Sequence, residues 1–189
     1  QVFGVPMEAV TSLQRRHAKA VNFGIVYGIS AWSLSQDIGV YAEEAKRYMD
    51  AYLDNYAGVR AYMKDIVAQA KELGYVTTLY GRRRYLPELK SSNFNLRAFG
   101  ERVALNTPIQ GTAADIIKLA MIRVDRALKQ EKLKARLILQ VHDELIVECP
   151  VEEADKVAAI LEREMTQVAQ LKVPLVVEAK QGVSWFDAK

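Results

Sequence analysis

Three adjacent side chains with metal-binding and proton-transfer chemistry stand in the stretch LILQVHDELIVE, residues 137–148. His142, Asp143 and Glu144 lie between two runs of strand-forming residues, which predicts the tip of a β-hairpin. Successive side chains of a strand point to opposite faces, so Asp143 and Glu144 do not easily hold one ion together. Two interpretations stay open. The tip is ordinary turn chemistry, or one carboxylate belongs to a site whose other ligands come from elsewhere.

A second set of residues, in RRHAKAVNFGIVYG at 15–28, combines cations with aromatic rings. Arg15, Lys19, Phe23 and Tyr27 recur at helical spacing, so on a helix they share one face along a line of about 18 Å. The cations lie at the N-terminal end, where free N–H groups and the helix dipole already favour anions. A triphosphate would fit there, with a base or sugar against the rings. The alternative is an amphipathic helix with both rings in a core and the cations in solvent.

The elements that position these residues are predicted from periodicity, caps and turn residues. Thr11 and Gln14 have the spacing of a capping box at the start of the first helix, and Gly74 closes a later one. Pro108 is expected to break a helix, because proline lacks an N–H and its ring clashes with the preceding turn. The predicted helices cover residues 13–28, 42–55, 58–73, 95–107, 112–130 and 151–169, and the predicted strands form a hairpin within 75–87, a hairpin over 135–148 and a last strand at 174–180. The fold class is therefore predicted to be α+β, with a helical first part and antiparallel strands in the second.

Composition excludes several classes of protein. Half of the 189 residues are apolar, which is typical of a globular chain, and no apolar run approaches the roughly 20 residues of a membrane span. Cys149 is the single cysteine, so an internal disulfide and a cysteine-rich zinc cluster are excluded, which predicts a reducing compartment. The first residues carry no secretion signal, and the chain does not begin with Met, which favours a fragment of a longer protein.

Positive charge is concentrated in residues 79–102, although the formal net charge of the chain is only +3. The basic residues of this strip are Arg82, Arg83, Arg84, Lys90, Arg97 and Arg102, against Glu88 and Glu101 alone. Such a strip attracts phosphate backbones, or it is simply a solvated face.

Three motifs together resemble family A DNA polymerases of the bacterial DNA polymerase I type. RRHAKAVNFGIVYG is similar to the nucleotide-binding helix of that family, QVHDELIVE to its C-terminal catalytic carboxylate motif, and RVALNTPIQGTAADIIK to the segment that follows the primer–template. The motifs occur in the order of the family, and the resemblance covers essentially the whole chain. It implies a mainly helical fingers subdomain with a small basic hairpin at residues 1–107, followed by the C-terminal part of an antiparallel-sheet palm at 108–189.

The resemblance implies a role for each residue of the nucleotide-binding helix. Arg15 and Lys19 would hold the triphosphate of an incoming dNTP, and Lys19 would also donate a proton towards the pyrophosphate leaving group. Phe23 would pack near the sugar and Tyr27 near the templating position. Phenylalanine at position 23 is the variant that goes with discrimination against dideoxynucleotides in this family.

The resemblance also implies contacts with DNA. The residues concerned are Arg102, Asn106, Gln110, His142, Arg82 and Arg84. The first three would touch the duplex from the minor groove, where every base pair offers nearly the same acceptors, and His142 would steady the primer terminus. Arg82 and Arg84 would touch the template backbone. Alternatively, Asn106 and Gln110 cap a helix and a turn, and the arginine run is solvated surface.

Asp143 resembles the ligand of a catalytic Mg²⁺, with Glu144 as a secondary catalytic member. Two-metal phosphoryl transfer needs ions roughly 4 Å apart, held by carboxylates that bridge both. The family's second essential aspartate comes from a strand upstream of the nucleotide-binding helix, outside this chain. Asp115 or Glu178 could substitute in principle, but no motif assigns them to that task. The chain alone is therefore expected to bind nucleotide and DNA weakly and to be inactive.

The resemblance thus implies DNA-templated DNA synthesis in replication and repair. The partners would be primer–template DNA, dNTP and the remainder of the polymerase chain, namely the thumb and N-terminal palm, in the cytoplasm at the nucleoid and without a membrane. One alternative is a non-catalytic nucleic-acid-binding module, which the missing carboxylate would favour. Another is a single-subunit RNA polymerase, against which the Phe-Gly pair at 23–24 and the VHDE motif argue.

Overall fold

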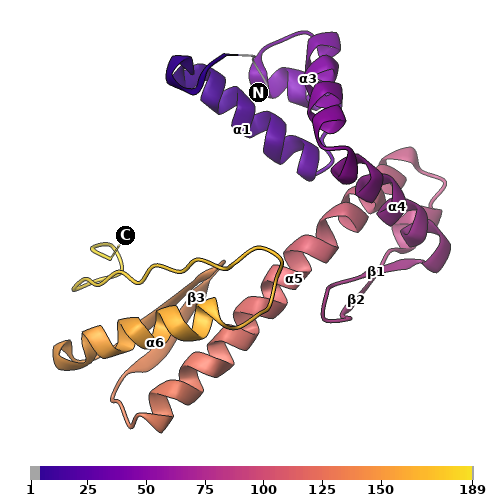
Figure 1. Ribbon diagram of the computed structural model, residues 1–189. Helices are drawn as coiled ribbons and strands as arrows, with labels where there is room; N and C mark the ends of the chain where they lie inside the picture. The colour runs from indigo at the N-terminus through magenta and orange to yellow at the C-terminus, as the bar shows by residue number, and fades with distance from the viewer. Residues whose placement is uncertain (1–4, 189) are drawn as a thin grey trace. The chain divides into compact units, whose positions relative to one another are not determined.

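The computed structural model describes residues 5–188 as helices with two small antiparallel hairpins (Figure 1), and this confirms the predicted α+β class. The chain forms two compact units, Gln1–Ile109 (unit 1) and Gln110–Lys189 (unit 2). Residues 1–4, with which the predicted first subdomain starts, lie outside the described residues. Within the described part, no helix combines the length and the apolar character that crossing a bilayer requires.

Unit 1 starts with helices whose ends follow local capping rules. These helices are η1 (Met7–Ala9), α1 (Ser12–Val26), α2 (Ala31–Ile38), α3 (Ala42–Asn55) and α4 (Ala57–Leu73). The predicted capping box is present at α1: the Thr11 N–H donates to Gln14 Oε1 at 2.9 Å, and the Gln14 N–H donates to Thr11 Oγ1 at 3.2 Å. Gly74, at φ +76°, closes α4 in the left-handed conformation that glycine adopts without strain.

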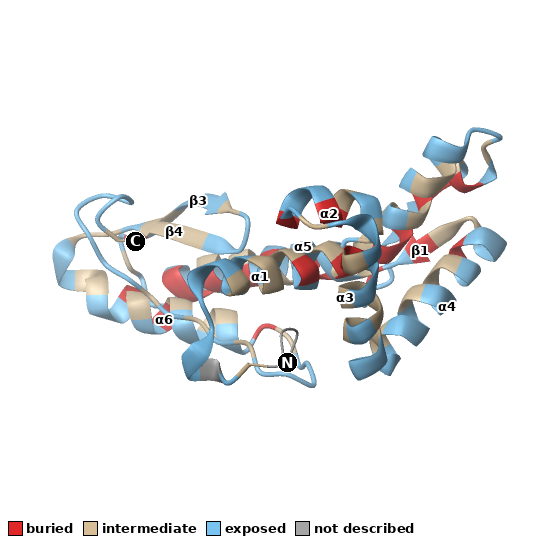
Figure 2. Ribbon diagram, turned by 90° about the horizontal axis from the view of Figure 1, so that it is seen from above, coloured by how far each residue is buried: buried red, intermediate tan, exposed pale blue. Residues whose placement is uncertain are grey.

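Helix α2 is an element that the sequence patterns did not predict. It is capped at both ends, because Ser30 Oγ accepts from the Ser33 N–H at 3.1 Å and Gly39 at φ +69° terminates it. Its apolar residues Leu34 and Ile38 are buried. They share a core with α1 and α3, whose buried members are Val21, Ile25, Leu34, Ile38 and Ala45 (Figure 2). Burying one such aliphatic side chain contributes about 1.5–3 kcal/mol, so this core fixes α1 against its neighbours.

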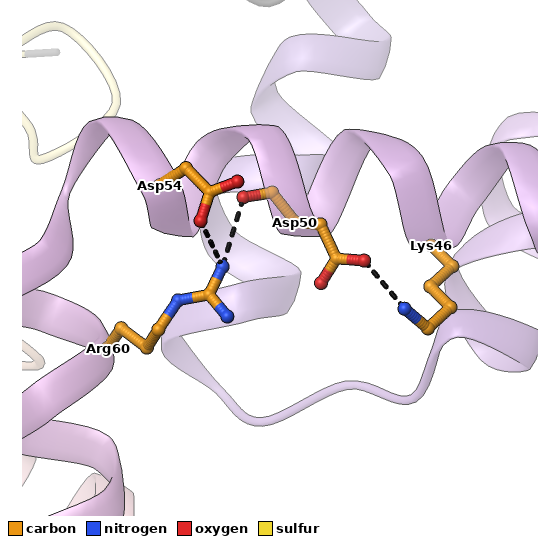
Figure 3. A network of polar contacts seen from close by, with 4 residues as sticks. All are labelled: Lys46, Asp50, Asp54 and Arg60. Carbon is orange, nitrogen blue, oxygen red and sulfur yellow. Dashed lines mark hydrogen bonds and ion pairs between the residues drawn. The ribbon is translucent and has the colours of Figure 1, made fainter.

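The junction of α3 and α4 is held by exposed polar contacts (Figure 3). Arg60 of α4 donates to Asp54 Oδ1 at 2.8 Å and to the Asp50 carbonyl oxygen at 3.2 Å. Lys46 pairs with Asp50 one turn earlier on α3, at 2.6 Å. Exposed pairs of this kind contribute roughly 0–1 kcal/mol each, so they orient the junction more than they stabilise it.

The predicted basic hairpin is present in unit 1. Strands β1 (Tyr75–Thr77) and β2 (Arg83–Tyr85) pair antiparallel, with Tyr75 opposite Tyr85, and the short helix η2 (Pro87–Lys90) follows. The hairpin is anchored through a second core of unit 1, whose buried members are Ala70, Val76, Leu86, Leu89 and Ala104. This core leaves the charged side chains of β2 on the surface.

Helix α5 (Phe94–Gln130) corrects the prediction of two helices separated at Pro108, because it continues through the proline. Its start is capped by Asn93 Oδ1, which accepts from the Asn95 N–H at 2.8 Å. Pro108 removes a single backbone donor, and its fixed φ is compatible with a helix. Residues on both sides of Pro108, such as Leu105 and Thr112, are buried.

Unit 2 contains the second predicted hairpin and one packed helix. Strands β3 (Arg136–Val141) and β4 (Glu144–Glu148) pair antiparallel, and η3 (Val151–Glu153) leads into α6 (Ala154–Thr166). The buried members of the main core are Val124, Ala127, Leu128, Ala135, Val157 and Ile160. The Glu153 carboxylate accepts from the backbone N–H groups of Lys134 and Ala135 at 3.0–3.1 Å, which ties the start of the hairpin to the helix.

The C-terminal part of unit 2 differs from the prediction in two places. The predicted helix at 151–169 is a 3₁₀ turn followed by α6, which ends at Thr166. The predicted strand at 174–180 has no assigned secondary structure and pairs with no strand in the described part of the chain. Alternate residues of this segment are half-buried, as in a strand, but the Ala179 N–H donates to Glu162 of α6 at 3.1 Å instead of to a strand edge. Strand propensity alone does not form a strand, because its backbone hydrogen bonds require a neighbouring strand.

Candidate functional site

The cation and aromatic face of α1 is present as predicted. Lys19 Nζ lies 5.7 Å from the centroid of the Phe23 ring, and the Phe23 and Tyr27 rings stack at 6.3 Å with an interplanar angle of 12°. The buried face of the helix is formed by Val21 and Ile25, whereas Phe23 and Tyr27 are 47% and 45% exposed. The alternative that placed both rings in a core is therefore wrong for this helix, and the rings are available to a ligand.

A hollow of about 550 Å³ lies beside this face, within unit 1. Its lining residues are Arg15, Ala18, Lys19, Asn22 and Phe23 of α1, Tyr52 of α3, and Tyr56 at the C-terminal cap of α3. The structure thus brings three of the four predicted nucleotide-binding residues to one cavity, the fourth being Tyr27 at the C-terminal cap of α1. The lining includes two cations and no carboxylate, so the hollow favours anions.

Sequence reasoning missed the contribution of α3 to this hollow. The Tyr52 hydroxyl donates to Asn22 Oδ1 at 2.6 Å, and the Tyr52 and Tyr56 rings pack at 4.8 Å. Tyr52 and Tyr56 are four residues apart, the spacing of one helix face, which would have revealed a shared face but not its partner. The contact with Asn22 joins positions thirty residues apart, and only the packing of α1 on α3 creates it.

The C-terminal end of α1 meets α5 at two of the predicted DNA-contacting residues. An ideal Cβ on Gly28, which has φ +72°, would lie 3.3 Å from Arg102 Cγ. The Asn106 amide donates to the Tyr27 carbonyl oxygen at 3.5 Å, while its Oδ1 is buried and lacks a partner within residues 5–188. An orphaned buried acceptor costs about 1–3 kcal/mol, so Asn106 is suited to accept from an added donor. Gln110 is exposed, four residues further along α5.

Replacing Gly28 by Ala is expected to lower the free energy of unfolding by about 2–3 kcal/mol. The new Cβ would meet Leu105 Cδ1 at 3.0 Å, and an L residue at φ +72° is strained in addition. Gly39→Ala is the matched control, since Gly39 has φ +69° but nothing within 4 Å of its Cβ. The free energy of unfolding of Gly39→Ala should fall by only about 1 kcal/mol, the cost of an L residue at positive φ. Chemical denaturation of both variants measures the difference, and equal losses would show that the contact with α5 is unimportant.

The three arginines of the basic hairpin differ in their contacts and exposure. Arg83 lies 4.7 Å from the Tyr75 ring, and its hydrogen bond with Tyr85 raises the pKa of the Arg83 guanidinium. Arg84 is exposed and has no side-chain partner among the described residues, whereas Arg82 is exposed but engaged, with its backbone closing the hairpin through Thr78. Of the three, Arg84 is the one that the structure leaves most accessible to a phosphate.

Part of the basic strip serves the fold instead. Arg97 donates to the carbonyl oxygens of Ser91 and Ser92 at 2.9 and 2.7 Å, which ties down the loop before α5. The positive charge of residues 79–102 is therefore not a single binding surface.

The tip of the β3–β4 hairpin carries the predicted His142, Asp143 and Glu144. His142 has φ +52°, a left-handed conformation that the tight turn between Val141 and Glu144 requires, and its carbonyl oxygen accepts from the Gln140 side chain at 2.6 Å. The carboxylates of Asp143 and Glu144 are exposed and have no hydrogen bond or ion pair within residues 5–188. The turn is thus held by its backbone and by Gln140, which leaves both carboxylates unused by the fold.

These carboxylates fit part of a site for a divalent cation. Hard oxygen ligands without competing partners suit Mg²⁺, but a complete site needs more of them. No group of three or more His, Cys, Asp or Glu side chains in the described part of the chain is arranged to hold a metal. Asp115 is buried and has a partner of its own, and Glu178 lies on the extended C-terminal segment, so neither is placed with Asp143 in such a group.

Comparisons with known proteins agree with these features. Residues 1–187 match the family model described as DNA polymerase family A. The chain is 57% identical to DNA polymerase I of Bacillus subtilis (strain 168) over 188 residues and 53% identical to DNA polymerase I of Bacillus caldotenax. Both alignments include 100% of this chain but 21% of the relative, so the chain spans about a fifth of these proteins.

A solved structure also superimposes on the whole fold. It is the POL domain of Pol1 from M. smegmatis in complex with DNA primer-template and dNTP, with a TM-score of 0.93 and 48% sequence identity. The match covers 99% of this chain and 33% of that one. The chain therefore corresponds to about a third of that solved chain.

Proposed function

The chain belongs to DNA polymerase family A, and on that premise we propose that it takes part in DNA-templated transfer of a nucleotide from a dNTP to a primer 3′ end, in replication and repair. The observation that carries the proposal is the hollow of unit 1, where Arg15, Lys19 and Phe23 converge in a cavity without carboxylates. The likeness to a domain solved with DNA primer-template and dNTP supports it.

In this proposal the face of α1 holds the incoming nucleotide. Arg15 and Lys19 neutralise the triphosphate, on which charge builds up during phosphoryl transfer. Phe23 packs against the sugar, and Tyr27 lies beside the templating position. Lys19 is also the catalytic acid, donating its proton towards the pyrophosphate leaving group.

In this proposal DNA is bound through side chains of α5 and of the two hairpins. Arg102, Asn106 and Gln110 of α5 contact the minor groove, His142 steadies the primer terminus, and Arg82 and Arg84 contact the template backbone. The unpartnered Oδ1 of Asn106 supports this assignment, because guanine presents an N2 amino donor in the minor groove.

Asp143 and Glu144 are the residues of this chain that would serve a catalytic cation. We propose Asp143 as a ligand of Mg²⁺ and Glu144 as its secondary partner, in a two-metal site completed by an aspartate outside this chain. When bound, the metal would stabilise charge on the reacting phosphate oxygens. The exposed, unpaired state of both carboxylates supports this proposal.

The assignment of subdomains follows from the same premise. Residues 1–107 form the fingers and 108–189 the C-terminal part of the palm, and the thumb and N-terminal palm are contributed by the remainder of the polymerase chain. On the same premise we propose that the protein acts in the cytoplasm, associated with the nucleoid.

Primer extension tests the proposed function directly. The 189-residue chain alone, with Mg²⁺, dNTP and a primer–template, is expected to give no measurable extension, because one metal-bridging carboxylate is missing. Addition of an upstream polymerase segment bearing the thumb and N-terminal palm should restore extension. Robust incorporation by the chain alone would contradict the incomplete site. DNA binding without recovery would favour the non-catalytic module, and a preference of the reconstituted protein for ribonucleotides would favour an RNA polymerase.

A further inference from the structure

The hollow of unit 1 contains a polar contact that the proposed roles do not use. The Tyr52 hydroxyl donates to Asn22 Oδ1 at 2.6 Å, and both side chains line the hollow. This bond engages the only acceptor of the Asn22 amide. Its Nδ2 donors have no partner within residues 5–188.

Asn22 stands among the cations of α1. It follows Lys19 by three residues, precedes Phe23 and shares the hollow with Arg15. Arg15 and Lys19 offer N–H donors only, and the amide of Asn22 now does the same, since its oxygen is engaged. The guanidinium, ammonium and amide donors of this cavity, with no carboxylate among its lining residues, match an anion with several oxygens.

Tyr52 holds one end of the Asn22 amide. An exposed asparagine rotates freely, and in one of its two orientations Oδ1 would repel a phosphate oxygen. In the structure the Tyr52 hydroxyl donates to Oδ1, which leaves Nδ2 as the end of the amide without a partner among the described residues. The Tyr56 ring, at 4.8 Å, packs against Tyr52, and burial raises the pKa of Tyr52, so the hydroxyl stays protonated.

We propose that Asn22 is a further phosphate-binding residue of the nucleotide site and that Tyr52 is the positioning residue that orients its amide. The ligand class is the polyphosphate of a nucleoside triphosphate. This inference rests on the proposed function, to which it adds one contact residue and one positioning residue from α3.

The test is calorimetric titration of the 189-residue chain at low ionic strength with inorganic tripolyphosphate and with dTTP. Asn22→Ala should weaken binding of both ligands about three- to tenfold, the loss expected for one hydrogen bond to a charged group. Asn22→Asp should weaken it further, because a carboxylate replaces the donor. Tyr52→Phe keeps the ring and should weaken binding about threefold, the effect of disordering one hydrogen bond. It should add nothing to Asn22→Ala in the double variant.

Two controls separate this inference from the fold and from the proposed function. Tyr48→Phe removes a hydroxyl that donates to Glu44 at 2.7 Å on the same helix, outside the hollow, and should leave binding unchanged. Arg15→Ala tests whether the ligands bind at the proposed nucleotide site itself. Loss of binding in Arg15→Ala but not in Asn22→Ala would overturn the inference alone, as would a Tyr52→Phe variant with a lower melting temperature and unchanged binding. Absence of binding by the wild-type chain would overturn the proposed nucleotide site and this inference with it.

Discussion

Replacing Asp143 by Asn is expected to lower the rate of primer extension by about a thousandfold, in the chain supplemented with the upstream polymerase segment. The change keeps the shape of the side chain and removes the charge that would bind a divalent cation, and a thousandfold corresponds to about 4 kcal/mol of lost transition-state stabilisation. Asp143 is exposed and without a partner in the described residues, so the melting temperature should not change. Single-turnover extension at saturating dNTP and Mg²⁺ measures the effect.

Two isosteric controls lie on the adjoining strand β4. Glu144→Gln should lower the rate by about tenfold, since Glu144 begins strand β4 whereas Asp143 lies in the turn before it, and we propose Glu144 only as a secondary partner. Glu148→Gln, at the far end of β4, removes the same charge and should have no effect. A similar loss in all three variants would attribute the change to the net charge of the hairpin and would contradict the assignment of Asp143 as a ligand.

The elements that sequence predicted well are those with local signals at both ends. The capping box at Thr11 and the left-handed Gly74 bound α1 and α4 within a residue or two of the expected positions. Helix α2 carries the same kinds of signal, Ser30 before it and Gly39 after it, but its eight residues are too few for a clear apolar period. Short helices of this kind are stabilised by the core they join, here through Leu34 and Ile38.

The errors arose where tertiary structure outweighs local preference. Pro108 lowers helix propensity, but α5 continues through it, with buried residues on both sides. Residues 174–180 have strand propensity, but the backbone of this segment bonds to Glu162 of α6 and pairs with no strand in the described part of the chain. In both cases the missing information is what the segment packs against.

The candidate site shows the same contrast between residues that local spacing predicts and residues that tertiary packing brings in. Spacing alone placed Arg15, Lys19 and Phe23 on one face, and the structure brings them to one hollow. Spacing could not supply Tyr52, because the bond to Asn22 depends on how α3 packs on α1. The residues found by sequence belong to one helix, whereas Tyr52, which was missed, joins two helices.

Replacing Lys19 by Ala is expected to lower kcat/KM for dNTP incorporation by about 10²–10³-fold in the supplemented polymerase, the range found for the loss of a preplaced charge or a general acid. Lys19 lies in a hollow without carboxylates and holds its ammonium near the Phe23 ring, 5.7 Å from the centroid, so within the described part of the chain no acidic group in the hollow neutralises it. Lys46→Ala is the matched control, because Lys46 is an exposed lysine of α3 whose partner is Asp50. Its removal should leave incorporation unchanged.

Lys19→Arg separates the two roles proposed for this side chain. Arginine keeps the positive charge, so binding of the triphosphate and KM for dNTP should change little. A guanidinium stays protonated at any working pH, and it therefore serves poorly as a proton donor to the leaving group. We expect kcat to fall by about 10²-fold with little change in KM, a split that steady-state incorporation at varied dNTP resolves. If Lys19→Arg instead retains the wild-type kcat while Lys19→Ala does not, Lys19 acts through its charge alone, and the proton must reach the pyrophosphate by another route.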